Sequence, residues 1–478
     1  MQLLQPDCIL DPLLEVATSL ALLPLNNTVL VATLVSDTSS SICSRPSPSN
    51  RRQALLRDVK FHPKTILVTG INTPHGLRVA RCFYEEGHRV VGAEINDSYI
   101  ASGESMSRAL SIHYSVPKSQ YVSDLLHIVQ REKVDVWIPC SSETTIAVDS
   151  MAKQAIESRT SCRCVSLDPG LAMQWSRPES FTQYLIDNDL PFVERHQVQS
   201  RDSIHRILHR SPTKSYQIRR LGPVGQEQPI VLPKSTMSLT YSQVSELQIS
   251  KDSPWLMQQH TRLGEFIAEL LVVRGHVTAI SVHSASEESD WARSPLNDGL
   301  AAAIQKLMES LASKGGPRMA GHLNVRLMVD KELTTNSVRY VVHIASCTQG
   351  SAAISHLLQN TPPRSLVGAY LEILSDDSVA PNCSPEILHG CDGTSVSKPP
   401  FPKPSLYEAV KGYDVRKVLP ALYPVAQRID RALDEACELL VFWEDWRFSS
   451  TDPLPWWWNA HVTRPLRMIE QLMKRPKK

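Results

Sequence analysis

A strand–helix–strand pattern that begins at Lys64 constrains the fold of this chain more than any other feature. The β-branched run Thr65–Thr69 is closed by Gly70, which predicts a short strand buried in a parallel sheet. Apolar residues at helical spacing follow over Leu77–Glu86, and Arg89–Glu94 predicts the next strand. Two parallel strands joined by a helix open a doubly wound sheet. With a helix at 121–132, a strand at 134–140 and a helix at 144–157, residues 64–165 predict a Rossmann-like α/β domain.

The pattern changes to strands with tight turns between residues 166 and 360. Gly275–His276 predicts a hairpin turn between two apolar runs, which indicates antiparallel pairing and an α+β domain. The predicted elements are a helix at 178–189, strands at 216–219, 255–260, 266–273 and 277–280, a helix at 298–313, and strands at 322–329 and 338–345. Residues 361–478 are Pro-rich and then helical, with helices expected at 418–440 and after Pro465.

The N-terminal segment, residues 1–35, is unusually apolar. Val16–Val35 contains no charged residue and is just long enough to span a bilayer, although Pro24, Asn26 and Asn27 lie in its middle. The basic flank that follows would stay in the cytosol. A spanning helix, a helix lying on a membrane surface and a buried helix are all compatible with this pattern. The Ser-, Pro- and Arg-rich residues 36–63 predict a disordered linker.

Composition narrows the classes of partner. The 478 residues include 50 basic and 49 acidic ones, so the net charge of +1 gives no general electrostatic case for nucleic acid. The ten cysteines show no C-x-x-C or mixed Cys/His spacing, so no zinc site is indicated and free thiols in a reducing compartment are expected. The expected location is the cytoplasm, with membrane association through residues 16–35 left open.

Two short patterns point weakly to nicotinamide chemistry. The turn from Gly70 to Gly76 follows the first strand, and Glu94 ends the second strand where a ribose would sit. Its spacing is G-x5-G, however, rather than G-x-G-x-x-G. Tyr114 and Lys118 have the spacing of short-chain dehydrogenases, but a proline between them disfavours the helical turn that this pair needs. A Rossmann-type oxidoreductase is therefore only an alternative.

Basic and aromatic residues form further groups. His205 and His209 share a helix face, but no third ligand completes a zinc site. Guanidinium groups suit phosphate oxygens, and arginines gather in this part of the chain. The members of this group are Arg195, Arg201, Arg206, Arg210, Arg219 and Arg220. Trp456–Trp458 are expected mainly to pack against protein, with a membrane interface as the alternative.

The order of these domains is that of the ATP-grasp ligases, and four segments carry the resemblance. Thr65–Gly70 is similar to the family's opening strand, and Arg131–Pro139 to its third strand with the basic turn before it. Pro254–Gln259 is similar to the hinge segment, whose backbone holds adenine. Asp452–Trp456 followed by His461 is similar to a C-terminal signature. More narrowly, the chain resembles mycosporine-glycine synthases and related fungal secondary-metabolite ligases over most of its length.

This resemblance implies a fold and a chemistry. The expected fold is a Rossmann-like pre-ATP-grasp domain, a two-lobed antiparallel ATP-grasp domain at 166–360 and a helical C-terminal cap. The expected activity joins a small-molecule carboxylate to an amine through an acyl phosphate, using ATP and Mg²⁺, in alkaloid or mycosporine-like secondary metabolism. In this reading Arg219 cradles the phosphates, Gln258 and Gln259 supply the hinge, and Glu265 holds the nucleotide or the second substrate.

The positions expected to bind magnesium lack acidic residues. Mg²⁺ needs hard anionic oxygens, which the family supplies from an Asp after a Gly and from a Glu-x-Asn-Pro-Arg run on two late strands. The alignment instead places Arg326, Ala345, Cys347 and Gln349 at these positions. Arg326 would replace one metal charge directly, which makes Arg219 and Arg326 the expected catalytic residues.

Two acidic residues, Asp330 and Glu332, follow Arg326 on the same predicted strand. They would take over the metal position only if the strand register differs from the alignment. Three readings remain: an active ligase with a rebuilt site, a catalytically degenerate ATP-grasp pseudoenzyme that acts as a binding partner, and a Rossmann-type oxidoreductase.

Overall fold

The computed structural model describes most of the chain, and its residues fall into two compact units. The described residues are 7–42, 48–96, 98, 100–142, 144–212, 214–220, 230–250, 255–261, 263–285, 297–334, 337–375, 387–389 and 445–474. Unit 1 comprises residues 1–168, 350–379 and 392–478, and unit 2 comprises residues 169–349 and 380–391. The helix expected at 418–440 lies outside the described residues.

Unit 1 is built on a five-stranded parallel sheet. Its strands are β1 (Thr65–Thr69), β2 (Arg89–Ile95), β3 (Ile112–Val116), β4 (Val136–Pro139) and β5 (Arg163–Cys164), in the order β3-β2-β1-β4-β5. Every pairing in it is parallel. The helix α3 (Pro74–Glu85) follows β1 and leads to β2. The predicted strand–helix–strand opening of a doubly wound sheet is therefore confirmed.

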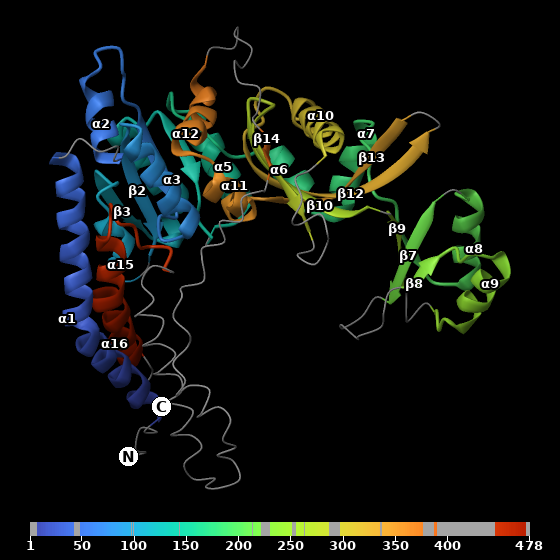
Figure 1. Ribbon diagram of the computed structural model, residues 1–478, viewed down its shortest axis with the longest axis horizontal. Helices are drawn as coiled ribbons and strands as arrows, with labels where there is room; N and C mark the ends of the chain where they lie inside the picture. The colour runs from blue at the N-terminus through green and yellow to red at the C-terminus, as the bar shows by residue number, and fades with distance from the viewer. Residues whose placement is uncertain are drawn as a thin grey trace. The chain divides into compact units, whose positions relative to one another are not determined.

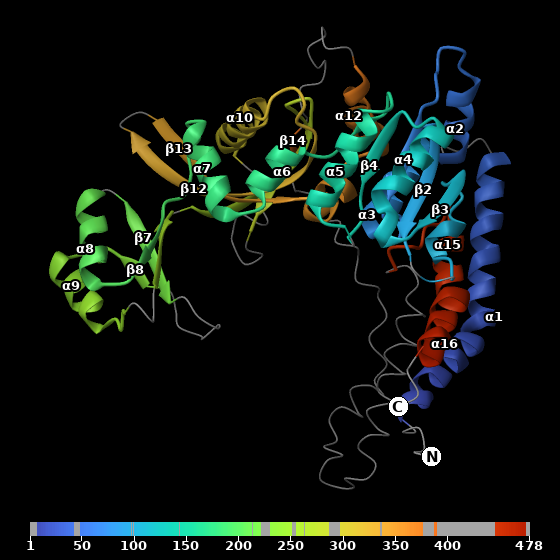
Figure 2. The same cartoon turned by 180° about the vertical axis from the view of Figure 1, so that it is seen from behind.

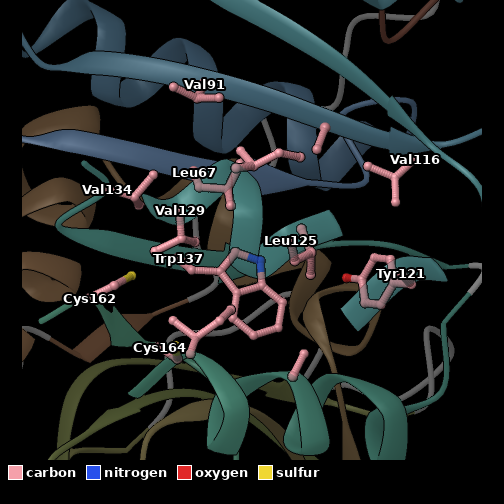
Figure 3. Close-up of a cluster of buried hydrophobic side chains, with 14 of the residues drawn as sticks. Leu67, Val91, Val116, Tyr121, Leu125, Val129, Val134, Trp137, Cys162 and Cys164 are labelled. Atoms are coloured by element: carbon pink, nitrogen blue, oxygen red, sulfur yellow. The ribbon is translucent and has the colours of Figure 1, made fainter. Parts of the chain in front are cut away.

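Trp137 on β4 lies at the centre of a hydrophobic core on one face of this sheet (Figure 3). Its side chain is 0% exposed and is surrounded by residues such as Leu67, Leu125 and Cys164. The indole Nε1 donates a hydrogen bond to Thr69 Oγ1 at 3.3 Å, so its one polar atom is satisfied. The helices α4 (Tyr121–Glu132) and α5 (Ile146–Glu157) contribute to this core.

Helix α3 covers the other face of the sheet (Figures 1 and 2). The chain returns to unit 1 after residue 349 and packs two short helices, α11 (Ser355–Asn360) and α12 (Pro363–Leu371), against α3. The rings of Phe83 on α3 and Tyr370 on α12 have centroids 5.8 Å apart. A segment far along the chain thus completes the Rossmann-like core.

The first and the last described helices also meet in unit 1. Helix α1 (Asp7–Ile42) lies beside α16 (Arg464–Lys474) in both views (Figures 1 and 2). The short helix α15 (Leu454–Trp458) and a π-helical turn at Asn459–Thr463 precede α16. Trp456 is 1% exposed and packs edge-on against Phe448, with ring centroids 5.5 Å apart. This agrees with the packing role expected for the tryptophan run.

Unit 2 begins with α6 (Pro169–Trp175) and α7 (Pro178–Asp187) and contains a four-stranded antiparallel sheet. The strands are β6 (Arg195–Val198), β7 (Ser215–Arg220), β8 (Ile230–Leu232) and β9 (Trp255–His260), in the order β6-β9-β7-β8. Helices α8 (Arg201–Arg210) and α9 (Met237–Glu246) contribute Ile204, Leu208 and Val244 to the core on one face. The alternate strand residues lie on the open face.

A second sheet of unit 2 has five strands. They are β10 (Gly264–Val273), β11 (His276–Ser284), β12 (Gly321–Thr334), β13 (Ser337–Gln349) and β14 (Ile387–His389), in the order β13-β12-β10-β11-β14. The pairings are antiparallel, as predicted, except that β14 runs parallel to β11. Helix α10 (Asp298–Lys314) packs against this sheet, and Leu323, Val325 and Leu327 of β12 are 0% exposed.

The prediction of a disordered linker at 36–63 is wrong for most of the residues described there. Helix α1 extends to Ile42, and α2 (Pro48–Arg57) follows. The guanidinium of Arg52 lies 4.1 Å from the centre of the Tyr84 ring and donates hydrogen bonds to the carbonyl oxygens of Tyr84 and His88. These partners lie more than thirty residues away in the chain, so local composition gives no sign of them.

Candidate functional site

Arg195 lies within electrostatic reach of two further arginines and one carboxylate on other strands of unit 2. Arg195 on β6 interacts electrostatically with Arg219 on β7, Glu265 on β10 and Arg326 on β12. The Nη1 atom of Arg326 is 3.6 Å from Oε2 of Glu265. Burial, followed by the positive charge of Arg219, lowers the pKa of Arg195. Three guanidinium groups and one carboxylate leave an excess of positive charge, which suits an anion such as a phosphate chain. These four residues are called the arginine cluster below.

Arg195 and Arg219 belong to the open face of the first sheet. Arg195 pairs with Gln258 on β9, and Arg219 pairs with Leu256 on the same strand. Directly paired residues of antiparallel strands point to the same face. Tyr216, an odd number of residues from Arg219, points to the covered face and is 0% exposed. Strand alternation therefore places both arginines and Gln258 on one surface.

The two predicted hinge glutamines point to opposite faces of β9. Gln258 Nε2 lies 3.4 Å from the sulfur of Met328, and Met328 pairs with Glu265 of the cluster. Gln259 is 6% exposed, and its Nε2 lies 3.5 Å from His343 Nε2. Both side chains thus reach the second sheet of unit 2, Gln258 on the side of the arginine cluster and Gln259 at His343.

The backbone of β9 is occupied by strand pairing. It pairs with β6 over residues 255–258 and with β7 over residues 255–260. Beyond that, the backbone N–H of Gln259 donates to the carbonyl oxygen of Glu194 at 2.9 Å. The contact between adenine and this backbone stays a prediction. A base that contacts the main chain here would meet it at the end of β9 rather than within it.

The expected metal positions lie on neighbouring strands but carry no carboxylate. Arg326 of β12 pairs with Ser346 of β13, and Ala345 is the extra residue of a β-bulge beside that pair. Cys347 follows on β13 and pairs with Val325. The side chains of Arg326, Ala345 and Cys347 offer no hard anionic oxygen, so these positions do not fit Mg²⁺.

The two acidic residues that follow Arg326 lie farther along β12. Asp330 pairs with Val341, and Glu332 pairs with Arg339. At the rise of an extended strand, four residues place Asp330 about 13 Å from Arg326 along β12. β12 continues without a break through this region, and a metal role for either acid stays a prediction.

Sequence reasoning missed two polar residues on the same face as Arg326. Glu269 on β10 pairs with Asn324 on β12, and Glu269 is 2% exposed. Arg326 pairs with Ile267, two residues from Glu269, so all of these side chains share a face. A signal was present, because Glu269 interrupts an otherwise apolar run on a predicted strand, and a buried carboxylate needs partners.

Arg201 and the two histidines of α8 have structural partners of their own. Arg201 at the start of α8 donates a hydrogen bond to the carbonyl oxygen of Leu247 at 2.9 Å. His205 packs on Tyr241 of α9 with ring centroids 4.5 Å apart, and His209 Nε2 lies 3.3 Å from the Tyr241 hydroxyl. The two histidines thus pack α8 against α9.

The glycine turn of unit 1 is filled by its own backbone. Thr73 Oγ1 donates to the carbonyl oxygen of Gly70 at 2.7 Å, and a Cβ on Gly70 would lie 2.4 Å from the backbone of Cys140. Glu94, which the oxidoreductase alternative places at the ribose, is 2% exposed. Burial raises its pKa, and Asn96 Nδ2 donates to its carboxylate at 3.3 Å. This geometry does not favour a dinucleotide at the turn.

The C-terminal signature has structural partners within unit 1. Asp452 is 3% exposed and accepts hydrogen bonds from Arg81 Nε at 3.0 Å and from Ser107 Oγ at 2.6 Å. His461 Nδ1 lies 3.0 Å from Ser19 Oγ on α1. Both residues therefore attach the C-terminal helices to the rest of the unit.

Comparison with known proteins gives similarity to solved structures only. No family model matches the chain, and no curated protein matches it. The chain is similar to the biotin carboxylase subunit of pyruvate carboxylase, with a TM-score of 0.45 and 9% identity over 65% of this chain and 70% of that one. It is similar to phosphoribosylglycinamide synthetase from Anaerococcus prevotii, with a TM-score of 0.39 and 13% identity over 64% and 77% of the two chains. It is also similar to an L-amino acid ligase from Bacillus licheniformis, with a TM-score of 0.36 and 12% identity over 62% and 72%.

Proposed function

We propose that this chain is an ATP-grasp-type ligase that binds the phosphate chain of ATP at the arginine cluster and joins a carboxylate to an amine. The observation that carries the proposal is that the charges of Arg219, Arg326 and Glu265 all act on Arg195, with Arg326 Nη1 at 3.6 Å from Glu265 Oε2. The planar donor fork of guanidinium matches phosphate oxygens and keeps its charge at any physiological pH. The three strands that supply these arginines belong to both sheets of unit 2, as an ATP-grasp site requires.

The chain's own residues bind and orient in this proposal. Arg195 and Arg219 hold phosphate oxygens from one sheet, and Arg326 supplies positive charge from the other. By the alignment, Arg326 takes the position of a metal ligand of the family, and in this proposal its guanidinium replaces part of the metal's charge. Bound ATP would supply the phosphoryl group that activates the carboxylate for attack by the amine. The resemblance of the quoted segments points to a secondary-metabolite substrate of the alkaloid or mycosporine-like kind.

A catalytically degenerate protein is the second candidate. It is favoured by one observation: the positions of Arg326, Ala345 and Cys347 offer no ligand for Mg²⁺. The same cluster would then hold a nucleotide without turnover, and the protein would act as a binding partner. The two candidates share nucleotide binding and differ in chemistry.

Equilibrium binding of ATP to the full chain, in EDTA and in Mg²⁺, tests the proposal. We expect binding in EDTA, because guanidinium groups rather than a metal contact the phosphates. Loss of all binding in EDTA, or binding of NAD(P) in place of ATP, would contradict the arginine site. Phosphate release that depends on added carboxylate and amine supports the ligase. ATP binding without release across a panel of such substrates supports the degenerate protein.

A further inference from the structure

Helix α1 has the reverse of the polarity expected for a surface helix in water. Its polar residues Ser19 and Asn26 face protein and are 5% and 1% exposed. Its apolar residues Leu20 and Val31 face outward and are 64% and 59% exposed. A helix on a water-facing surface places its apolar side chains inward and its charges outward. The outward surface of α1 is therefore fitted to an apolar medium.

The exposed residues of α1 form one continuous stripe. They recur at intervals of three and four residues, which is the spacing of one helix face. The members of this outer stripe are Ala17, Leu20, Ala21, Pro24, Leu25, Thr28, Val31, Ala32, Leu34 and Val35. All but Thr28 are apolar, and no charged residue lies between Val16 and Val35. Among the described helices, α1 is the one with a segment long and apolar enough to cross a membrane, Val16–Val35. Only 11% of that segment is buried.

Two threonine hydroxyl groups of Val16–Val35 have hydrogen-bond acceptors within their own helix. Thr28 Oγ1 on the outer stripe donates to the carbonyl oxygen of Pro24 at 2.9 Å. Thr33 Oγ1 donates to the carbonyl oxygen of Val29 at 3.0 Å. Polar groups that enter hydrocarbon must find such partners within their own segment. The outer stripe thus has a low cost of transfer from water to lipid.

The inner side of α1 is held by the C-terminal helices. Asn26 Nδ2 lies 3.0 Å from His461 Nε2, and Trp457 Nε1 donates to Asn27 Oδ1 at 2.9 Å. A helix that crossed the bilayer by itself would have to break these bonds and carry both asparagines into hydrocarbon. With the bonds intact, only the outer stripe can meet lipid. The geometry therefore favours a helix that lies along the membrane surface over one that spans it.

The next helix supplies charge of the sign that lipid headgroups attract. Helix α2 (Pro48–Arg57) contains three arginines and no acidic residue. Arg57 and Lys60 are exposed, and Val59 between them is 94% exposed. Asp58 is the one acidic residue in this stretch. Exposed cations beside an exposed apolar residue complement anionic headgroups at a membrane surface.

We propose that this protein binds the surface of an anionic lipid bilayer through the outer stripe of α1. The helix lies in the plane of the interface, α15 and α16 hold its inner side, and the basic residues after α1 face the headgroups. The binding is mainly apolar, because the stripe carries no charge. It is therefore retained at high salt, whereas the contribution of Arg57 and Lys60 is screened.

Co-sedimentation of the full chain with vesicles tests this surface. The vesicles contain phosphatidylcholine with about one fifth phosphatidylserine, which gives the negative surface that cations attract. The double variant Leu20→Glu/Val31→Glu is expected to lower the lipid-bound fraction by about tenfold or more. The matched control is Met151→Glu/Met173→Glu, because these methionines are 60% and 72% exposed outside α1. Equal binding by wild type, test variant and control would overturn the proposal, as would binding lost entirely in high salt.

Two further measurements separate lipid from the other occupants and modes. Light scattering without lipid reports whether the stripe binds a second copy. A dimer that the Leu20→Glu/Val31→Glu variant abolishes, together with no vesicle binding, would overturn the lipid assignment. Synthesis of the chain with sealed microsomes, followed by protease, reports the mode of attachment. A tag placed before Met1 is expected to be digested together with residues after α1, and protection of either end would show a spanning helix instead.

Discussion

The side-chain amide nitrogen of Asn26 lies 3.0 Å from Nε2 of His461, although the two residues are 435 positions apart in the chain. An amide nitrogen only donates, so Nε2 accepts and Nδ1 carries the ring proton. Nδ1 then donates to Ser19 Oγ at 3.0 Å, and Ser19 Oγ donates to the carbonyl oxygen of Ala460 at 3.2 Å. The tautomer of His461 follows from these partners, and the two ends of unit 1 are joined by one chain of hydrogen bonds.

Replacing Asn26 by leucine should destabilise this junction. The side chain keeps its approximate size, but His461 Nε2 loses its donor in a half-buried site. We expect a loss of about 1–3 kcal/mol in the free energy of unfolding, measured by urea titration at neutral pH. Thr28→Val is the control, because Thr28 is exposed and bonds only to its own helix. A control that costs as much as Asn26→Leu would show that the pair contributes nothing specific.

Local sequence patterns predict the parallel sheet better than the parts that depend on distant contacts. The run Thr65–Thr69 is β1 with the predicted bounds, because its β-branched residues are buried on both sides. The sequence predicts a linker where α2 forms, because Arg52 finds its partners on α3 and after it. The spacing of apolar residues within a segment predicts the periodicity of that segment. It does not predict which distant residues pack against the segment.

The candidate site shows the same limit. Arg219 and Arg326 can be singled out from alignment to a family pattern, and in the structure the charges of both act on Arg195. Arg195 is only one of several arginines in the sequence, and its place in the cluster comes from the pairing of β6 with β9. The bulge at Ala345 shifts β13 by one residue against β12. Register shifts of this kind are set by the whole sheet and leave no mark on a single sequence.

Glycine substitutions should separate close packing from helix propensity in unit 1. A Cβ on Gly76 would lie 2.2 Å from the carbonyl oxygen of Gly70, so Gly76→Ala must displace backbone at the start of α3. We expect Gly76→Ala to lower the free energy of unfolding by more than about 2 kcal/mol. A Cβ on Gly368 in α12 would meet nothing within 4 Å. Gly368→Ala should therefore raise the free energy of unfolding by about 0.5–1 kcal/mol, because alanine lowers the conformational entropy of the unfolded chain. Thermal and urea unfolding measure both changes, and a shift of the same sign in the two variants would refute this account.

Acid should weaken unit 1 through His88. Burial, with the nearby charges of Arg52 and Lys64, lowers the pKa of His88 from 6.5 to about 4. The unfolded chain therefore binds a proton at this site between these values and the folded chain does not. The contribution of neutral His88 to the free energy of unfolding is fully present above its unfolded pKa of 6.5. It falls as the pH drops from 6.5 toward the folded pKa of about 4. Urea titration at several pH values should show a smaller acid loss in His88→Gln than in wild type, and identical pH dependence in both would rule out His88 as a contributor.

Opposite changes in ATP affinity should distinguish the roles of Arg326 and Glu265. Arg326 Nη1 lies 3.6 Å from Glu265 Oε2, so each residue alters the charge that the other presents. Arg326→Ala removes a phosphate donor and is expected to weaken ATP binding by about tenfold or more. Glu265→Gln removes a negative charge beside the phosphates and is expected to tighten it by a few-fold. Lys306→Ala, an exposed residue on α10, is the charge control and should change little. Calorimetry in EDTA measures the ATP affinity of each variant. Weaker binding in Glu265→Gln would instead support a direct contact between Glu265 and the nucleotide, because only the loss of such a contact would outweigh the relief of charge repulsion.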